Sequence, residues 1–226
     1  MSSSGGNRPR LAVLVSGRGR NLQALQAACA DGRIEADLVR VISNQPDAPA
    51  LQLARDAGID ALALPHRDFD SRADFDTALG AALREARPDI VALAGFMRIL
   101  GAELVAEFQN RMLNIHPSLL PKYPGLETHQ RAVQAADDEH GATVHFVNGD
   151  LDGGPCVIQG KLKTRPGEDV QSLASRVLQD IELKIYPQAV AWMARGELTC
   201  ARGQAMFKGR PLPAPLSLED LEASFR

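Results

Sequence analysis

The first hundred residues alternate between short apolar runs and segments with helical spacing, and no other feature restricts the fold as strongly. We predict strands at 10–16, 34–43, 59–64 and 90–94, of which 10–16 and 90–94 are continuous apolar runs. We predict helices between them, at 22–30, 48–57 and 69–86. Unbroken apolar strands are typical of parallel sheets buried on both faces by helices. The sequence therefore predicts an α/β fold on a mostly parallel, doubly wound, Rossmann-like sheet.

The alternation becomes less regular after residue 110. We expect a short strand that carries Asn114 and His116, and a long helix at 170–195 that is interrupted near Pro187. Between them we expect a helix at 128–136 and strands at 142–147 and 156–162. Glycines and prolines after residue 197 predict a hairpin or an extended segment over the core. Since no linker divides the chain, we expect a disordered tail at 1–8 and one domain at 9–226, with halves at 9–110 and 111–226.

Composition excludes several classes of function. The net charge is −3 and aromatic residues make up only 4% of the chain, so neither nucleic acid nor an anionic membrane is an expected partner. Cys29, Cys156 and Cys200 are far apart and form no C-x-x-C pair, which favours a reducing compartment and no zinc site. No apolar run approaches the roughly 18 residues of a membrane span. We predict a cytoplasmic protein without a metal.

A glycine-rich turn, Gly17-Arg18-Gly19-Arg20-Asn21, links the first predicted strand to the first helix. Backbone N–H groups in such a turn and at the helix N-terminus bind anions. A dinucleotide fingerprint would have a glycine in place of Leu22 and an acidic residue after the second strand, which ends Ile-Ser-Asn at 42–44. The turn therefore suits a monophosphate better than a nicotinamide dinucleotide. A tight turn without a ligand remains the alternative.

Asn114 and His116 lie at the end of a predicted strand, directly before a proline-rich segment at 117–125. Side chains two residues apart on a strand point to the same face. An amide can stabilise an oxyanion and an imidazole can transfer a proton near neutral pH, so this pair suits acyl chemistry. Asp152, in the turn Leu-Asp-Gly-Gly-Pro, would keep an adjacent imidazole protonated and oriented. The alternatives are a strand-end pair bonded to its own loop and an Asx-type turn.

The other histidines give weaker signals. We expect His129, at a helix start, and His145, within a strand, to be packed and hydrogen-bonded, whereas His66 and His140 fall in polar, loop-like stretches. The histidines and cysteines have no metal-ligand spacing. No Gly-x-Ser-x-Gly elbow is present either.

Six stretches of the chain occur together in a recognisable order, at 13–22, 41–44, 93–100, 113–126, 140–147 and 151–155. They resemble the phosphoribosylglycinamide formyltransferases, a group within the folate-dependent formyltransferase family, over about residues 10–215. Asn-Ile-His-Pro-Ser-Leu-Leu-Pro with a downstream Leu-Asp-Gly-Gly is specific to folate formyltransferases. Lys-Tyr-Pro-Gly at 122–125 and the short chain favour this group.

The resemblance implies a formyltransferase fold and an enzyme of de novo purine biosynthesis. Such an enzyme transfers the formyl group of 10-formyltetrahydrofolate to the amino group of glycinamide ribonucleotide. The resemblance implies catalytic roles for Asn114, His116 and Asp152. The residues implied to bind the ribonucleotide are Gly19, Arg20, Asn21 and Glu182. Those implied to bind the folate are Arg72, Met97, Arg98, Ile99, Leu100 and Asn114. No metal is needed, and a monomer or homodimer is expected.

In the implied mechanism, the glycinamide amine attacks the formyl carbon. Protonated His116, held by Asp152, stabilises the tetrahedral oxyanion and passes a proton to the leaving folate nitrogen. Asn114 adds a hydrogen bond to that oxyanion, and the turn at 148–152 closes over the pteridine.

The chain departs from the family pattern at several positions. The late helix has Leu183 after Glu182, where the family has histidine, and by our count one residue more before Tyr-Pro. Glu127 stands where histidine is common. Arg18 and Arg20 replace smaller residues and would add charge near the phosphate.

Four other functions fit the sequence less well than formyl transfer to glycinamide ribonucleotide. A methionyl-tRNA formyltransferase would need a further basic domain of about a hundred residues, and a formyltetrahydrofolate hydrolase usually carries an N-terminal regulatory domain. A nucleotide-binding module without catalysis would not need Asn114, His116 and Asp152 together. A nicotinamide dehydrogenase is disfavoured by Leu22 and by the missing acidic residue.

Overall fold

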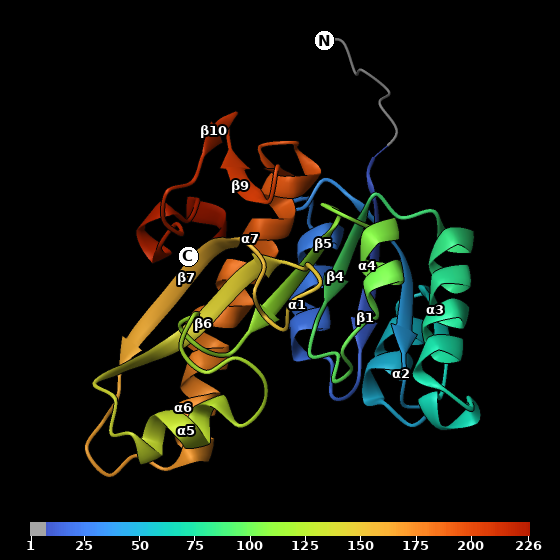
Figure 1. Cartoon of the computed structure of the whole chain (residues 1–226). Helices are drawn as coiled ribbons and strands as arrows, with labels where there is room; N and C mark the ends of the chain where they lie inside the picture. The colour runs from blue at the N-terminus through green and yellow to red at the C-terminus, as the bar shows by residue number, and fades with distance from the viewer. Residues whose placement is uncertain (1–7) are drawn as a thin grey trace.

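The computed structural model describes residues 8–226, so most of the predicted tail at 1–8 lies outside the described residues. A seven-stranded sheet forms the centre of the molecule (Figure 1). Its strands are β1 (Arg10–Val15), β2 (Asp37–Ser43), β3 (Asp60–Ala63), β4 (Ile90–Leu93), β5 (Met112–His116), β6 (Glu139–Phe146) and β7 (Cys156–Lys163). The first five strands are parallel, and β6 and β7 each pair antiparallel with the strand before them. The predicted α/β fold with a mostly parallel sheet is confirmed.

The strand order is β3-β2-β1-β4-β5-β6-β7. The chain therefore runs outward from β1 to β3 and then returns to the other side of β1 at β4. The connections that leave the carboxyl ends of β1 and β4 consequently run in opposite directions. This place is a topological switch point, where open α/β sheets bind their ligands.

Helices cover both faces of the sheet, as its alternating burial requires. In β1, Leu11, Val13 and Val15 contribute to one apolar cluster, while Ala12 and Leu14 contribute to the other. The first face is covered by α1 (Arg20–Ala30), α2 (Pro49–Asp56) and the C-terminal helices, and the second by α3 (Arg72–Ala86) and α4 (Ala102–Glu107). The remaining helices are α5 (Thr128–Gln134), α6 (Val170–Val177) and α7 (Leu183–Ala194). The prediction of a doubly wound sheet is confirmed.

The long C-terminal helix is interrupted at a different place from the one we predicted. A π-helical turn, η2 (Leu178–Glu182), separates α6 from α7, and Pro187 lies inside α7. Pro187 lacks the N–H that would pair with the carbonyl of Leu183. The wider turn ends just before Leu183, so the hydrogen-bond register changes one turn before the proline.

The tail forms a small antiparallel sheet from β8 (Leu198–Ala201), β9 (Gln204–Phe207) and β10 (Arg210–Pro211), which confirms the predicted hairpin. Leu216 then forms a bridge beside Ile158 of β7. Short 3₁₀ turns complete the secondary structure: η1 (His66–Asp68), η3 (Leu218–Asp220) and η4 (Ala223–Phe225). Helix α4 was not predicted, because its six residues are too few to show a helical period.

Candidate active site

A cavity of about 780 Å³ opens beside the carboxyl ends of β4 and β5. Asn114 and His116 line its floor, and Asp152 reaches it from the turn between β6 and β7. Asn21 and Glu182 line one part of the wall, and the segment from Gly95 to Leu100 lines another. The structure therefore brings the three predicted catalytic residues together at the predicted edge of the sheet.

Asn114 is oriented by its neighbour across the sheet. It pairs in register with His145 of β6, so both side chains lie on the same face. The Asn114 amide nitrogen lies 3.1 Å from Nε2 of His145 and 3.5 Å from Oδ1 of Asp152. His145 Nδ1 lies 2.8 Å from the carbonyl of Phe146, which can only accept, so Nδ1 carries the proton and Nε2 accepts from Asn114. The amide N–H₂ group is thereby fixed toward the histidine and the carboxylate.

His116 is buried, with only 5% of its surface exposed. Its Nε2 donates to the carbonyl of Tyr123 at 2.8 Å, and its Nδ1 lies 3.4 Å from Oδ2 of Asp152. Burial lowers the pKa of His116 below its ordinary value, although the Tyr123 bond and the Asp152 charge oppose this. The expected imidazolium is therefore not the favoured form at neutral pH without ligands, because desolvation outweighs the carboxylate. The neutral ring leaves Nδ1 free to accept a proton.

Asp152 is held by more than the histidines. Its Oδ2 accepts the backbone N–H of Gly125 at 2.8 Å, which joins the turn to the proline-rich segment after β5. Burial raises the pKa of Asp152, but the adjacent His145, the hydrogen bond from Gly125 and the nearby His116 lower it overall. The carboxylate is therefore ionised at neutral pH and can stabilise an imidazolium that forms at His116.

Asn21 and Glu182 form a buried polar pair at the opposite wall. The Asn21 amide donates to Oε2 of Glu182 at 2.7 Å, across 161 positions of sequence. Each residue is 9% exposed, and Oδ1 of Asn21 has no hydrogen-bond partner among residues 8–226. Burial raises the pKa of Glu182, and the bond from Asn21 opposes this. This pair can bind hydroxyl or amino groups of a ligand.

The glycine turn leads from β1 into α1. Gly19 caps α1 with a φ of 75°, and a Cβ there would lie 2.8 Å from the Cβ of Ala50. Only glycine meets both constraints without displacement. The side chains of Arg18 and Arg20 are exposed and lie outside the cavity lining, whereas Asn21 lines the cavity. Of the four predicted ribonucleotide residues, Asn21 and Glu182 line the cavity, whereas Gly19 and Arg20 do not.

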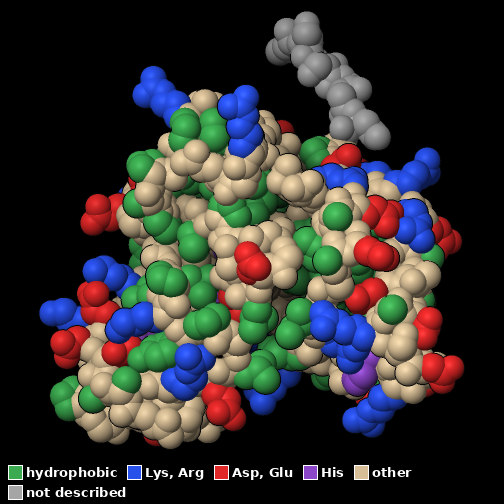
Figure 2. All heavy atoms as spheres, viewed as in Figure 1, with side chains coloured by type: hydrophobic (Ala, Val, Ile, Leu, Met, Phe, Trp, Pro, Cys, Tyr) green, Lys and Arg blue, Asp and Glu red, His purple; other side chains and the backbone are tan. Residues whose placement is uncertain are grey.

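The predicted folate residues divide into two sets. Met97, Arg98, Ile99 and Leu100 line the cavity. Arg72 does not, since it lies on α3 with its Nε 3.9 Å from Oδ2 of Asp76. Four large apolar side chains are exposed and all line the same cavity: Met97, Ile99, Leu126 and Leu151. In Figure 2, hydrophobic side chains also gather in the middle of the face shown, between the part that carries α3 and α4 and the part that carries β6 and β7.

One histidine differs from our expectations, and two others have a contact that we did not predict. His145 is buried and hydrogen-bonded as predicted, but it also lines the cavity and contacts Asn114. His140 is not in a loop: it lies buried in β6, with Nε2 3.0 Å from Nδ1 of His129. His129 lines the cavity as well. The alternation at 142–147 predicted a strand but not its partner, and the pairing with β5 decides which histidine meets Asn114.

Within residues 8–226, no group of three or more His, Cys, Asp or Glu side chains is arranged to hold a metal ion. In the same range, no helix is both long and apolar enough to cross a membrane.

Comparisons with known proteins agree on one family. A family model described as formyl transferase matches residues 9–190. The chain is 45% identical over 203 residues to the phosphoribosylglycinamide formyltransferase of Escherichia coli (strain K12), covering 90% of this chain and 95% of that protein. It is 41% identical over 204 residues to the enzyme of the same name from Haemophilus influenzae, covering 90% and 96%. The solved structure of phosphoribosylglycinamide formyltransferase from Coxiella burnetii matches with a TM-score of 0.88 at 41% identity, covering 93% and 99%.

Proposed function

This chain belongs to the formyl transferase family, and we propose that it acts as a phosphoribosylglycinamide formyltransferase of purine biosynthesis. It transfers a formyl group to the amino group of glycinamide ribonucleotide. Members of the family take that group from a formyl folate, and we propose 10-formyltetrahydrofolate as the donor. The observation that carries the proposal is the meeting of Asn114, His116 and Asp152 on the floor of one cavity between two chemically different walls.

The two walls suit the two substrates. The α1 N-terminus, with backbone groups of Gly19, Arg20 and Asn21, suits the phosphate of the ribonucleotide. The buried polar pair of Asn21 and Glu182 suits its hydroxyl and amino groups. The exposed apolar side chains of Met97 and Ile99 suit the flat rings of a folate, and Arg98 beside them suits its carboxylates.

The transfer requires one proton to move from the acceptor to the donor. The uncharged glycinamide amine attacks the formyl carbon, and a C–N bond forms while the carbonyl oxygen becomes an oxyanion. The amide N–H of Asn114 stabilises that oxyanion. Nδ1 of His116 accepts the proton that the amine loses, and Asp152 stabilises the resulting imidazolium. The proton then passes to the folate nitrogen as its bond to the formyl carbon breaks.

We also propose the setting of the reaction. The protein is cytoplasmic, since three dispersed free cysteines favour a reducing compartment. It acts as a monomer or homodimer. Residues 9–226 form one domain, since the seven-stranded sheet extends across residue 110. No metal takes part, since a histidine, an amide and a carboxylate supply the proton transfer and the oxyanion contact.

The decisive test is a deformylation assay. The protein is mixed with 10-formyltetrahydrofolate, and loss of the formyl group is followed by absorbance with and without glycinamide ribonucleotide. Loss only with the ribonucleotide supports the transferase. Loss without it would assign a hydrolase instead, and no loss in either mixture would leave a binding protein or a different acceptor.

A further inference from the structure

The segment that faces the proposed folate site lacks regular structure. Residues 95–101, here called the donor segment, connect β4 to α4 without helix or strand. Met97 and Ile99 are 66% and 54% exposed, so packing of their side chains contributes little to fixing the segment. Two of its backbone N–H groups instead donate to side chains from distant elements.

The first of these side chains is Ser16, at the carboxyl end of β1. The N–H of Met97 donates to Oγ of Ser16 at 2.7 Å. The Ser16 hydroxyl itself donates to Oδ1 of Asn44 at 2.5 Å, and Asn44 is only 2% exposed. Because the hydroxyl proton is directed at Asn44, a lone pair of Oγ is directed at Met97. The strand ends of β1 and β2 thus hold one end of the donor segment.

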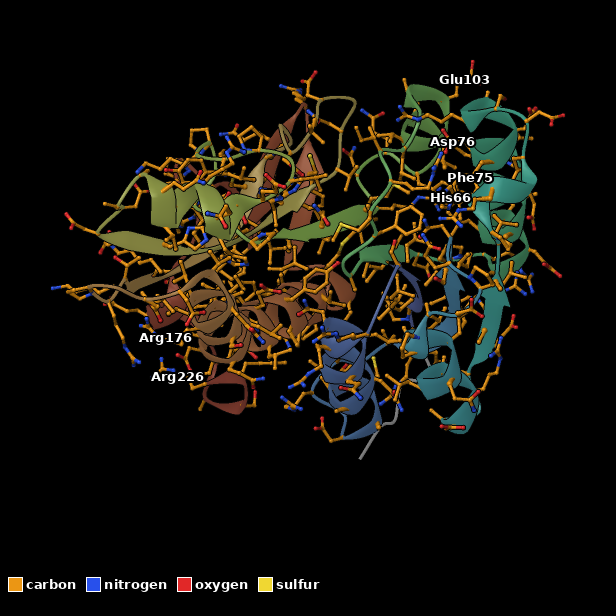
Figure 3. The ribbon with its side chains drawn as sticks, turned by 90° about the horizontal axis from the view of Figure 1, so that it is seen from below. His66, Phe75, Asp76, Glu103, Arg176 and Arg226 are labelled. Atoms are coloured by element: carbon orange, nitrogen blue, oxygen red, sulfur yellow. The ribbon has the colours of Figure 1, made fainter. Side chains whose placement is uncertain are left out.

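The second side chain is Asp76, on α3. The N–H of Gly101 donates to Oδ2 of Asp76 at 2.8 Å, and the Asp76 side chain is 11% exposed. A Cβ at Gly101 would lie 2.6 Å from the same oxygen, so glycine leaves room for this contact. In Figure 3, Phe75 and Asp76 lie on the side of α3 that faces α4.

The same part of α3 also holds a side chain of the donor segment. The Arg98 guanidinium lies over the ring of Phe75, 4.9 Å from its centroid. Arg98 lines the cavity, so this contact helps to fix the direction in which the guanidinium points. Contacts from α3 therefore fix both the backbone and the one charged side chain of the donor segment.

We propose that Ser16 and Asp76 are positioning residues for the formyl donor, each acting through one backbone N–H of the donor segment. The inference rests on the proposed function, because it assumes that this segment contacts the folate. An exposed segment that is already ordered binds its ligand without a further loss of conformational freedom. Leu100 packs in the apolar cluster with side chains of α3 and α4. Loss of either hydrogen bond therefore loosens mainly the exposed part around Met97 and Ile99, and donor affinity falls. Neither bond involves Asn21 or Glu182, the buried polar pair of the ribonucleotide wall, which bond each other.

Binding and kinetics of single variants test this. Dissociation constants for 10-formylfolate are measured by titration calorimetry, and KM values for both substrates by the deformylation assay. Ser16→Ala and Asp76→Ala should each weaken 10-formylfolate binding about tenfold, the usual size of one lost hydrogen bond. KM for glycinamide ribonucleotide should change by less than about twofold, because its wall is intact. Asp76→Asn should retain near-normal donor binding, since the amide oxygen still accepts from Gly101.

Two controls match the variants chemically. Ser43→Ala removes a hydroxyl at the neighbouring strand end, where Oγ accepts from the backbone N–H of Gln45. Thr77→Ala removes an exposed hydroxyl next to Asp76, which bonds only the carbonyl of Ala73. Both should bind 10-formylfolate like the unchanged protein.

A double-mutant cycle provides an independent test. Gly101→Ala displaces the Asp76 carboxylate and should weaken donor binding to a similar extent as Asp76→Ala. Since both changes break the same bond, the double variant should be no weaker than the single ones.

Several results would overturn the inference. One is that Ser16→Ala and Asp76→Ala bind 10-formylfolate as tightly as the controls do. Another is that Asp76→Asn binds it as weakly as Asp76→Ala. A third is that the variants lose affinity for both substrates in parallel. If the unchanged protein transferred no formyl group but the variants still lost 10-formylfolate binding, the proposed function would fail and the positioning would stand.

Discussion

At the scale of single residues, the site depends on how Asn114 is oriented. An amide can present either its N–H₂ group or its oxygen, and only the N–H₂ group can stabilise an oxyanion. His145 and Asp152 both face this group with acceptors, so the amide cannot turn without losing both contacts. The N–H₂ group is thus fixed before any substrate binds, and an oxyanion would take over the N–H that makes the long 3.5 Å contact with Asp152.

Replacing Asn114 by alanine should reduce kcat on the order of 100- to 1,000-fold, as loss of one oxyanion donor does elsewhere. The fold should be unaffected, because Asn114 is partly exposed to the cavity and its neighbours are polar. Steady-state kinetics with circular dichroism as the folding control would check this. A variant with near-normal kcat would remove Asn114 from the mechanism.

His116 should give the reaction an acidic limb in its pH profile. Its folded pKa lies below the ordinary value of 6.5, and the neutral ring is the form that accepts the proton. The rate constant kcat/KM should therefore be constant near neutral pH and fall as the pH drops through the lowered pKa.

The variant Asp152→Asn separates the two effects on His116. The carboxylate raises the pKa of His116, so its removal should move the acidic limb to still lower pH as well as reduce the rate. An unchanged limb in Asp152→Asn would mean that a different group titrates.

At the scale of elements, α7 is attached to the sheet by a buried tyrosine. The hydroxyl of Tyr186 lies 2.8 Å from the carbonyl of Leu93 and 3.0 Å from that of Leu113, near the ends of β4 and β5. This contact fixes the helix that follows η2, and hence the position of Glu182.

Tyr186→Phe should lower the free energy of unfolding by about 1–3 kcal/mol, since it leaves a buried carbonyl without a donor. Urea denaturation would measure this change. The KM for glycinamide ribonucleotide should rise in the same variant, since Glu182 is the last residue of η2, directly before α7. A loss of stability with unchanged KM would show that η2 is fixed by other contacts.

The contact between α5 and β6 should make stability depend on pH. His129 and His140 face each other with ring nitrogens 3.0 Å apart. Burial and the neighbouring imidazole lower the pKa of His129 from 6.5 to about 4. The unfolded chain binds more protons between these values, so stability is complete above about pH 6.5 and is lost as the pH falls toward 4.

We expect this loss to be about 1–2 kcal/mol, because partial exposure of His129 reduces the effect of the full shift. Urea denaturation at neutral and acidic pH should show a smaller difference for His129→Gln than for the unchanged protein. His66→Gln is the control, since His66 lies in η1 and its ring contacts Asn44 rather than another histidine. Equal pH dependence in all three proteins would contradict the assignment.

At the scale of the whole molecule, the sequence predicts those features of the fold that depend on local residue patterns. Unbroken apolar runs predicted the parallel strands, and period-2 spacing placed Asn114 and His116 on one face. Strand order and pairing depend on contacts between distant segments, so the role of His145 could not be predicted. Desolvation of His116 likewise depends on the completed cavity, so the direction of its pKa shift could not be predicted from the sequence.

The distance in sequence between Asn21 and Glu182 has a consequence for synthesis on the ribosome. These residues are 161 positions apart, yet together they form one wall of the cavity. A nascent chain that has already exposed β1 and α1 therefore has only half of that wall. It gains the other half only when the C-terminal helices emerge and Tyr186 reaches the sheet. Truncated chains that end before η2 should consequently not bind the ribonucleotide, and so should not compete for it with the full-length enzyme.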